Sequence, residues 1–207
     1  MIEGLVFDLD GVLLDSFRAH YDFVELKARE HRIHVPSIQQ AKDNIASPMQ
    51  NWLRSFGFPE EIIPQMLEEY RKYMVSVDIP FYEGIPELLI EFKQKYKFGI
   101  ASSNNRKTID AQLKKARLDS IFGAIVGLED VSNPKPHPEM VRAIMKRLGV
   151  CPEEVIFVGD MRIDAIAARR SKVRAAMLTT GSNSYAELRR EKPYRIFRNI
   201  KELRTII

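Results

Sequence analysis

Two aspartates one residue apart follow an apolar run near the N-terminus, in the stretch LVFDLDGVLLDS at residues 5–16. An ionised carboxylate, here that of Asp8, can attack phosphorus and form an aspartyl phosphate. A second carboxyl group, here that of Asp10, can protonate a leaving group and later activate water. A surface turn with two capping aspartates is the alternative, and it is the commoner meaning of an isolated Asp-x-Asp. The apolar residues before Asp8 weaken it, because they favour a buried strand.

The stretch GIASSNNR, residues 99–106, ends an apolar run with hydroxyl and amide side chains. Ser102 and Ser103 are expected where a strand ends, and Asn104 is expected where a helix starts. A hydroxyl group beside free backbone N–H groups at a helix start makes an anion site. Simple N-capping is the alternative role for these residues.

The stretch SNPKPHPE, residues 132–139, holds a lysine between two prolines. The prolines restrict the backbone on both sides of Lys135 and so aim its side chain. A fixed ammonium group can offset the charge of a transferring phosphoryl group. A solvated loop lysine is the alternative for this stretch taken alone.

The stretch VIFVGDMRIDA, residues 155–165, carries two further carboxylates after an apolar run. Asp160 follows the run, and Asp164 lies about one helical turn later. Beside Asp8, these two hard oxygen donors could hold Mg²⁺, which prefers carboxylates and water as ligands. The alternative is that Asp160 merely caps the helix that carries Asp164.

The elements that must position these residues alternate between strands and helices. Apolar runs predict strands over residues 4–9, 97–102, 123–128, 154–159, 174–179 and 194–198. Helices are predicted between them over residues 83–96, 104–117, 137–149 and 162–172. This alternation is typical of βαβ units, so we expect an α/β fold with a parallel sheet flanked by helices.

The region after the first strand interrupts this alternation. It contains no convincing strand, and it predicts helices over residues 16–32, 38–56 and 60–76. We therefore expect a core domain of residues 1–15 and 81–207 and an inserted helical domain of residues 16–80. The insertion should lie over the carboxyl end of the first strand, the edge where open α/β sheets bind ligands.

Composition bounds the class of protein. The chain has 207 residues, of which 45% are hydrophobic, enough for a sizeable core. Its net charge is +4, but 32 basic residues are scattered among 28 acidic ones, so no nucleic acid partner is expected. Cys151 is the only cysteine and cannot form an internal disulfide. With neither a membrane span nor a signal peptide expected, the prediction is a cytoplasmic protein.

The four polar stretches together indicate metal-assisted phosphoryl transfer, because all of them lie at predicted strand ends that share one sheet edge. In that order, DLDGVLLDS, IASSN, NPKPHPE and VGDMRID, they resemble the haloacid dehalogenase superfamily. The chain is similar to its phosphoglycolate phosphatase and beta-phosphoglucomutase branch, with a helical cap inserted after the first strand. The resemblance implies a Rossmann-like sheet with the strand order 3-2-1-4-5.

The resemblance also implies roles for individual residues. Asp8 would be the nucleophile and a Mg²⁺ ligand, and Asp10 would be the acid and base, with its main-chain carbonyl on the metal. Ser102 would bind the phosphoryl oxygens, and Lys135 would neutralise them and steady Asp8. Asp160 would ligate Mg²⁺, and Asp164 would orient metal-bound water or the lysine. The predicted set that binds substrate and phosphate is Asp8, Leu9, Asp10, Ser102, Ser103, Asn104, Lys135 and His20.

The leading hypothesis is a Mg²⁺-dependent phosphatase that acts on a small phosphorylated metabolite, as a monomer or a homodimer. A sugar phosphomutase is the alternative, which is weakened because the stretch NIASPMQNW at residues 44–52 lacks the arginine that such mutases place there. A catalytically silent binding protein is the third hypothesis. Among cap residues, His20, Tyr21, Asn51 and Arg54 are candidates for substrate contact, whereas Trp52 and Phe56 are expected to pack the cap.

Overall fold

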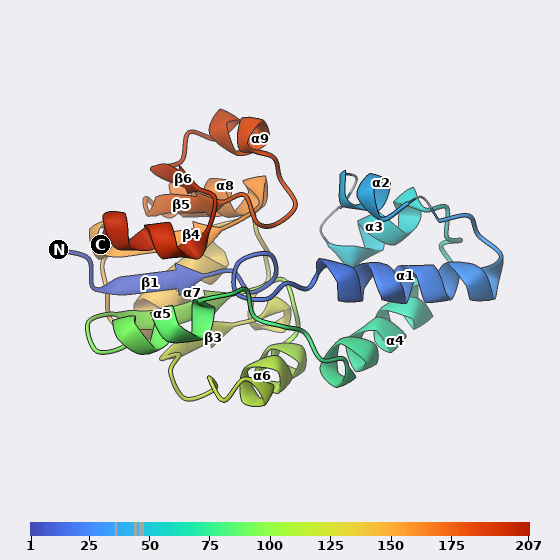
Figure 1. Cartoon of the computed structure of the whole chain (residues 1–207), viewed down its shortest axis with the longest axis horizontal. Helices are drawn as coiled ribbons and strands as arrows, with labels where there is room; N and C mark the ends of the chain where they lie inside the picture. The colour runs from blue at the N-terminus through green and yellow to red at the C-terminus, as the bar shows by residue number, and fades with distance from the viewer. Residues whose placement is uncertain (36, 44, 46–47) are drawn as a thin grey trace.

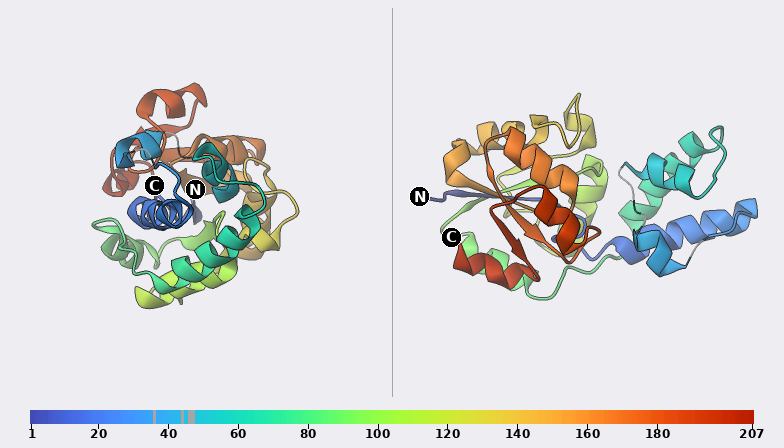
Figure 2. Two further views of the ribbon diagram at one scale, coloured as in Figure 1. Left: turned by 90° about the vertical axis from the view of Figure 1, so that its right-hand side faces the viewer. Right: turned by 90° about the horizontal axis from the view of Figure 1, so that it is seen from above.

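The computed structural model describes residues 1–35, 37–43, 45 and 48–207. Two bodies lie side by side along its long axis, and both chain termini lie at the end of the larger body that is remote from the smaller one (Figure 1, Figure 2). The larger body contains the sheet, and the smaller contains only helices among its described residues.

The sheet in the described part of the chain has six parallel strands in the order β3-β2-β1-β4-β5-β6. The strands are β1 (Gly4–Phe7), β2 (Lys97–Ala101), β3 (Ala124–Val126), β4 (Val155–Gly159), β5 (Arg174–Leu178) and β6 (Arg195–Phe197). All six predicted strands are confirmed, as is the predicted order, to which β6 adds an edge. The fold is therefore the α/β arrangement expected from the sequence.

β1 lies at the centre of the sheet, and all four of its residues are buried. Leu5 and Phe7 pack into the apolar cluster on one face, and Val6 packs into the cluster on the other. A strand covered on both faces needs apolar residues at successive positions, which explains the run that precedes Asp8.

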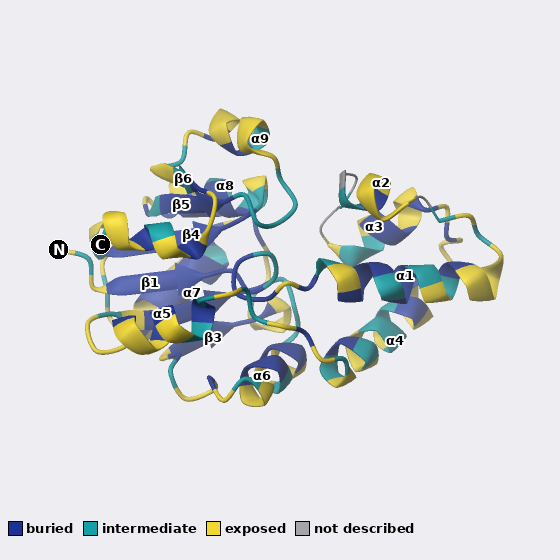
Figure 3. Cartoon of the chain, viewed as in Figure 1, coloured by how far each residue is buried: buried dark blue, intermediate teal, exposed yellow. Residues whose placement is uncertain are grey.

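Helices cover both faces of the sheet. One face packs against α5 (Ile85–Phe92), α6 (Arg106–Lys115) and a 3₁₀ helix at Ile200–Thr205. The other packs against α7 (Glu139–Leu148), α8 (Arg162–Arg170) and α9 (Tyr185–Arg190). The buried stripe of each helix faces the sheet and the exposed residues face outward (Figure 3). The four helices predicted here are confirmed, whereas α9 and the 3₁₀ helix were not expected.

The smaller body consists of α1 (Phe17–His31), α2 (Ile38–Asp43), α3 (Met49–Ser55) and α4 (Ile63–Ser76). It has its own apolar cluster around Phe23, Trp52 and Met66. The prediction of one helix over residues 38–56 was wrong. Pro48 has an extended backbone, with φ −75° and ψ 167°, so a helix cannot continue through it. α3 therefore begins anew at Met49.

Two neighbouring chain segments join the bodies. The amide of Asp15 donates to the carbonyl of Pro80 at 2.9 Å, and the amide of Tyr82 donates to that of Leu13 at 3.0 Å. None of the described helices has both the length and the apolar character needed to cross a membrane.

Candidate active site

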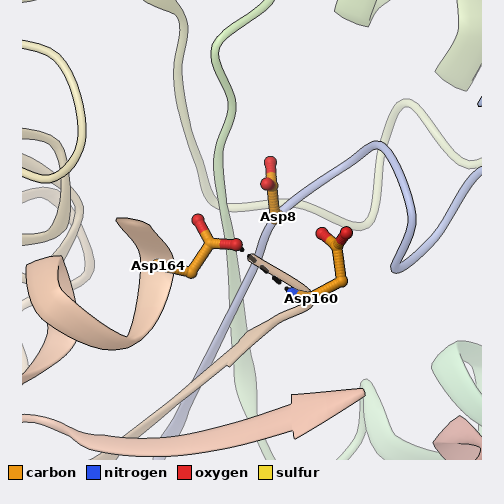
Figure 4. A group of neighbouring side chains, drawn as sticks. All are labelled: Asp8, Asp160 and Asp164. Carbon is orange, nitrogen blue, oxygen red and sulfur yellow. Dashed lines mark hydrogen bonds between the residues drawn. The ribbon is translucent and has the colours of Figure 1, made fainter. Parts of the chain in front are cut away.

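Three carboxylates meet at the edge of the sheet that faces the smaller body. Asp8 follows β1, Asp160 follows β4, and Asp164 lies in the first turn of α8. Each offers an oxygen within 4.8 Å of the others, and all three side chains are buried. Figure 4 shows the carboxylates turned toward a common space. The convergence expected from strand ends is therefore present.

Lys135 lies between two of these carboxylates. Its Nζ is 2.8 Å from Asp8 Oδ2 and 2.7 Å from Asp164 Oδ1, and it donates to the carbonyl of Ala101 at 3.1 Å. The ammonium group is almost completely buried, so each of its partners stabilises a charge that water does not reach. The two carboxylates outweigh the effect of burial and raise the pKa of Lys135 above its ordinary value. The lysine is fixed in place, as its flanking prolines predicted.

Asp8 is held from both sides. The backbone amide of Leu9 donates to its Oδ1 at 2.7 Å, while Oδ2 faces the ammonium of Lys135. Burial raises the pKa of Asp8 to about 7, against the opposing charge of Lys135 and with a further contribution from the negative charge of Asp164. A neighbouring cation would favour its ionised, nucleophilic form.

Asp160 lies in a cradle of backbone atoms. A Cβ atom at Gly181 would collide with its carboxylate, and one at Gly11, where φ is +74°, would approach it to 2.6 Å. The amide of Ser182 donates to Oδ2 at 3.0 Å, but Oδ1 is buried and has no hydrogen-bond partner among the described residues. Burial, then the charges of Asp164 and Asp8, raise the pKa of Asp160 well above its ordinary value.

The donor set fits a divalent cation. Three buried carboxylates face one ammonium group, and an uncompensated negative charge is costly at such a place. Carboxylate oxygens are the ligands that Mg²⁺ prefers. The unpartnered Oδ1 of Asp160 is the oxygen whose environment a cation would complete.

Asp164 also holds its own helix. Its Oδ2 accepts from the backbone amides of Asp160 and Met161 at 3.2 and 3.0 Å, at the start of α8. Met161, not Asp160, occupies the N-cap position of α8, so the alternative in which Asp160 caps this helix was wrong. One carboxylate thus fixes both the lysine and the turn that carries Asp160.

Asp10 contacts residues of both bodies. Asn104 Nδ2 donates to its Oδ2 at 2.6 Å, and Nε2 of His20 on α1 lies 3.5 Å from its Oδ1. Tyr70 on α4 bonds Nδ1 of His20 at 2.9 Å. Burial acts to raise the pKa of Asp10, but the hydrogen bonds from His20 and Ser16 and the charge of His20 outweigh it and lower that pKa.

Ser102 and Ser103 lie directly after β2. The hydroxyl of Ser102 is buried and accepts from the amide of Asn104 at 3.1 Å, whereas Ser103 and Asn104 line a cavity. The helix begins later than expected: Asn105 is its N-cap and accepts from the amide of Thr108 at 2.9 Å. Asn104 is therefore free of the helix and reaches Asp10 instead.

Residues after β5 complete the site and were missed in the sequence. Thr180 Oγ1 donates to the carbonyl of Gly11 at 2.7 Å, and Gly181 and Ser182 lie against Asp160. As at the other strand ends, polar residues follow the strand directly, here TTGS after β5. Hydroxyl groups and a glycine are weaker signals of chemistry than carboxylates.

A cavity of about 630 Å³ opens above the carboxylates, between the two bodies. Asp8, Asp10 and Asp160 line its floor, and residues of α1, α3 and α4 line its far side. His20 lines it as expected, while the described lining includes neither Tyr21, Asn51 nor Arg54. Trp52 packs the helical cluster, as expected, and reaches the cavity as well.

A family model described as haloacid dehalogenase-like hydrolase matches residues 5–178. The pyrophosphatase PpaX of Bacillus cereus (strain AH820) is 27% identical over 202 residues, which cover 93% of this chain and 90% of that protein. The pyrophosphatase PpaX of Oceanobacillus iheyensis is 26% identical over 210 residues, with coverages of 100% and 97%.

Solved structures share the fold. A hydrolase from Pseudomonas syringae matches with a TM-score of 0.80 at 27% identity, over 99% of both chains. A predicted phosphoglycolate phosphatase from Haemophilus somnus matches with a TM-score of 0.88 at 20% identity, over 99% of this chain and 97% of that one. The family model covers most of the chain and the architecture agrees throughout, so this chain belongs to the haloacid dehalogenase-like hydrolase family.

Proposed function

We propose that this protein is a Mg²⁺-dependent phosphatase that hydrolyses a small phosphorylated compound through an aspartyl phosphate on Asp8. The observation that carries the proposal is the buried ammonium of Lys135, which lies within 2.8 Å of both Asp8 and Asp164. A lysine held in this way offsets charge at Asp8, where a phosphoryl group would be transferred. The phosphatase and pyrophosphatase names of the relatives support a phosphorylated substrate.

The first step would be attack of the Asp8 carboxylate on phosphorus, with breakage of the bond to the leaving oxygen. Asp10 would give its proton to that oxygen. Lys135 would offset the charge of the phosphoryl oxygens, and Ser102 would bind those oxygens. The fixed position of Asp8 between Leu9 and Lys135 favours this step, because little reorganisation precedes it.

The second step would be attack of water on the aspartyl phosphate. The ionised Asp10 would take a proton from the water, and Asp8 would leave as a free carboxylate with release of phosphate. Because the pKa of Asp10 is lowered, the ionised form that this step needs dominates near neutral pH. The protonated form needed in the first step is the scarcer one.

Asp8, Asp160 and the main-chain carbonyl of Asp10 would hold the metal ion, with Asp164 orienting its water or Lys135. Bound Mg²⁺ would supply charge neutralisation at the phosphoryl oxygens. The unpartnered Oδ1 of Asp160 supports this assignment.

We further propose that residues 16–80 are a cap domain over a core of residues 1–15 and 81–207. The paired segments around Asp15 and Tyr82 would be the boundary between them. His20 and Tyr70 would belong to the cap and meet Asp10 across that boundary. The cavity between the bodies would then be the substrate site.

Replacement of Asp8 by Asn tests the function. Wild-type protein should release phosphate from a panel of phosphorylated metabolites in the presence of Mg²⁺, and chelation should stop the release. Asp8→Asn should lose the activity while its circular dichroism spectrum and cooperative unfolding stay intact. Phosphate release by this variant at the wild-type rate would refute the assigned nucleophile.

Hydrolysis of pyrophosphate is a second candidate, favoured by the name of relatives at 27% identity. Phosphorus NMR separates it from monoester hydrolysis, because pyrophosphate gives two phosphates and no alcohol. The same spectra test a phosphomutase, which would move the phosphate of a hexose 1-phosphate without releasing it. If no compound were turned over with any divalent metal, a silent binding protein would be the better description.

A further inference from the structure

Apolar side chains predominate on the wall of the cavity opposite the carboxylates, although Lys42, Gln50 and Arg71 also line it. This inference rests on the phosphatase function proposed above. We propose that the substrate is a phosphate monoester whose organic part is apolar and about the size of an aromatic ring. A second phosphate or a polyhydroxylated sugar would fit a mainly apolar wall less well.

The helices of the smaller body supply the wall. The apolar lining side chains on α1, α3 and α4 are Phe17, Met49, Trp52, Leu67 and Tyr70. The rings of Phe17 and Trp52 lie 6.1 Å apart, and each also contacts a further ring, so they form a packed surface. An apolar group placed there would leave water without losing hydrogen bonds.

The core adds apolar side chains on the rim of the same cavity. Leu128, Met161 and Ile163 line it, and Leu128 is exposed in spite of its size. Polar core residues such as Asp8 and Asn104 line the floor, and Asn105, Thr108 and Glu129 also belong to the lining. The cavity thus has a polar end for the phosphoryl group and an apolar end for the rest.

Two cations of the smaller body line the cavity without forming a second phosphate site. Arg71 is bound by Glu68 of its own helix at 2.7 Å. The Nζ of Lys42 lies 5.7 Å from the ring centroid of Phe17, where the methylene stem of a lysine can extend the apolar surface. Neither forms a convergent pair of donors such as a terminal phosphate needs.

The size of the cavity points the same way. About 630 Å³ is typical of a site for an organic ligand and far exceeds the space of a pyrophosphate ion. Sugar hydroxyls set against Phe17, Met49 or Leu67 would lose their hydrogen bonds to water without finding protein partners. An aromatic group would instead gain the free energy of buried apolar surface.

Binding of phosphonates tests the proposal, because the C–P bond gives no turnover. Trp52 is the only tryptophan and lines the cavity, so its fluorescence can report binding. With Mg²⁺ present, benzylphosphonate should bind at least about tenfold more tightly than methylphosphonate, from the apolar area of the ring. 2,3-Dihydroxypropylphosphonate should bind no better than the methyl compound. Tighter binding of the dihydroxypropyl compound or of imidodiphosphate would overturn the proposal.

Paired variants show whether the wall is responsible. Leu67→Asn should weaken benzylphosphonate about tenfold and leave methylphosphonate unchanged. Ile90→Asn is the matched control, since Ile90 is 55% exposed on α5 and outside the described lining. Equal effects of the two variants, or an equal loss for both ligands, would contradict the proposal. Should the phosphatase function fail, Asp8→Asn would not change turnover, whereas these binding results would stand by themselves.

Discussion

The sheet edge that carries Asp8, Asp160 and Asp164 and the wall of the cavity are built in opposite ways. At the edge, buried charged groups such as Lys135 and Asp164 contact one another across elements, and glycine backbone surrounds Asp160. On the wall, buried and half-buried apolar side chains present most of the surface, and Arg71 is paired with Glu68 of its own helix. Under the proposed function, the core would carry out the reaction and the helical body would select the substrate.

The attachment of the helical body fits this division. On α6 of the core, Gln112 Nε2 donates to the carbonyls of Met74 and Val77 at 2.7 and 3.0 Å. Lys115 Nζ donates to the carbonyls of Ser76 and Val77. The end of α4 is therefore fixed to the core, so the wall has a defined position above the carboxylates.

Replacement of Lys135 by Met should have the largest effect on both stability and activity. It leaves buried carboxylates without their cation, which should cost roughly 3–5 kcal/mol of unfolding free energy. The kcat/KM for a phosphorylated substrate should fall about a thousandfold through lost charge stabilisation. Thermal unfolding and steady-state kinetics measure the two effects.

Lys146→Met is the control for that loss, because Lys146 lies exposed on α7. It should change neither quantity by more than experimental error. Similar losses in both variants would mean that the ion pairs of Lys135 with Asp8 and Asp164 make no specific contribution to stability or rate.

Asp10→Asn should cost about a hundredfold in kcat, since it removes the proton transfer but keeps the shape. The loss should grow as the leaving group becomes a poorer one, because protonation then matters more. Rates for a series of aryl phosphates measure this dependence. A loss that is constant across the series would contradict an acid role for Asp10.

Phe17→Ala tests the role of the cavity wall. It removes apolar surface from the wall, so KM for an aryl phosphate should rise about tenfold. The kcat should stay within about twofold, because Asp8 and Lys135 are untouched. Should kcat fall as far as kcat/KM, the wall would take part in the reaction itself.

The stability of the metal-free protein should fall as pH rises from about 4 to 7. Burial raises the pKa of Asp8 from 3.8 to about 7, so the folded state binds this proton more tightly than the unfolded state does. The contribution is complete below about pH 4 and is lost as pH rises toward 7. Unfolding temperatures at pH 5 and 7 in chelator measure it against Asp8→Asn, in which this part of the slope should vanish.

Much of the site followed from the sequence because parallel strands end at one edge. Asp8 and Asp160 directly follow strong apolar runs, and the structure brings them together with Asp164 and Lys135. Carboxylates after such runs are costly unless paired, which makes them a strong signal. The strand order was also predictable from the resemblance.

The parts that the sequence did not predict depend on contacts between distant segments. Thr180 and Gly181 matter because of where Gly11 and Asp160 lie, and no local pattern shows that. α9 has six residues and little periodicity, although Ser184 and Glu187 form a capping box at its start. Asn51 was a candidate for substrate contact, whereas its neighbours Gln50 and Trp52 line the cavity instead.

The central claim is that the phosphoryl group is transferred to Asp8 and then to water. Isotope labelling tests this claim most directly. A single turnover in ¹⁸O-labelled water should put the label in released phosphate and leave the peptide that contains Asp8 unlabelled, because water attacks phosphorus. Rapid acid quench with ³²P-labelled substrate should give radioactive protein in the wild type and in Asp10→Asn, but not in Asp8→Asn. A ³²P-labelled wild-type peptide that maps to Asp8 is the predicted result, and turnover without any protein-bound phosphate at Asp8 would contradict the account.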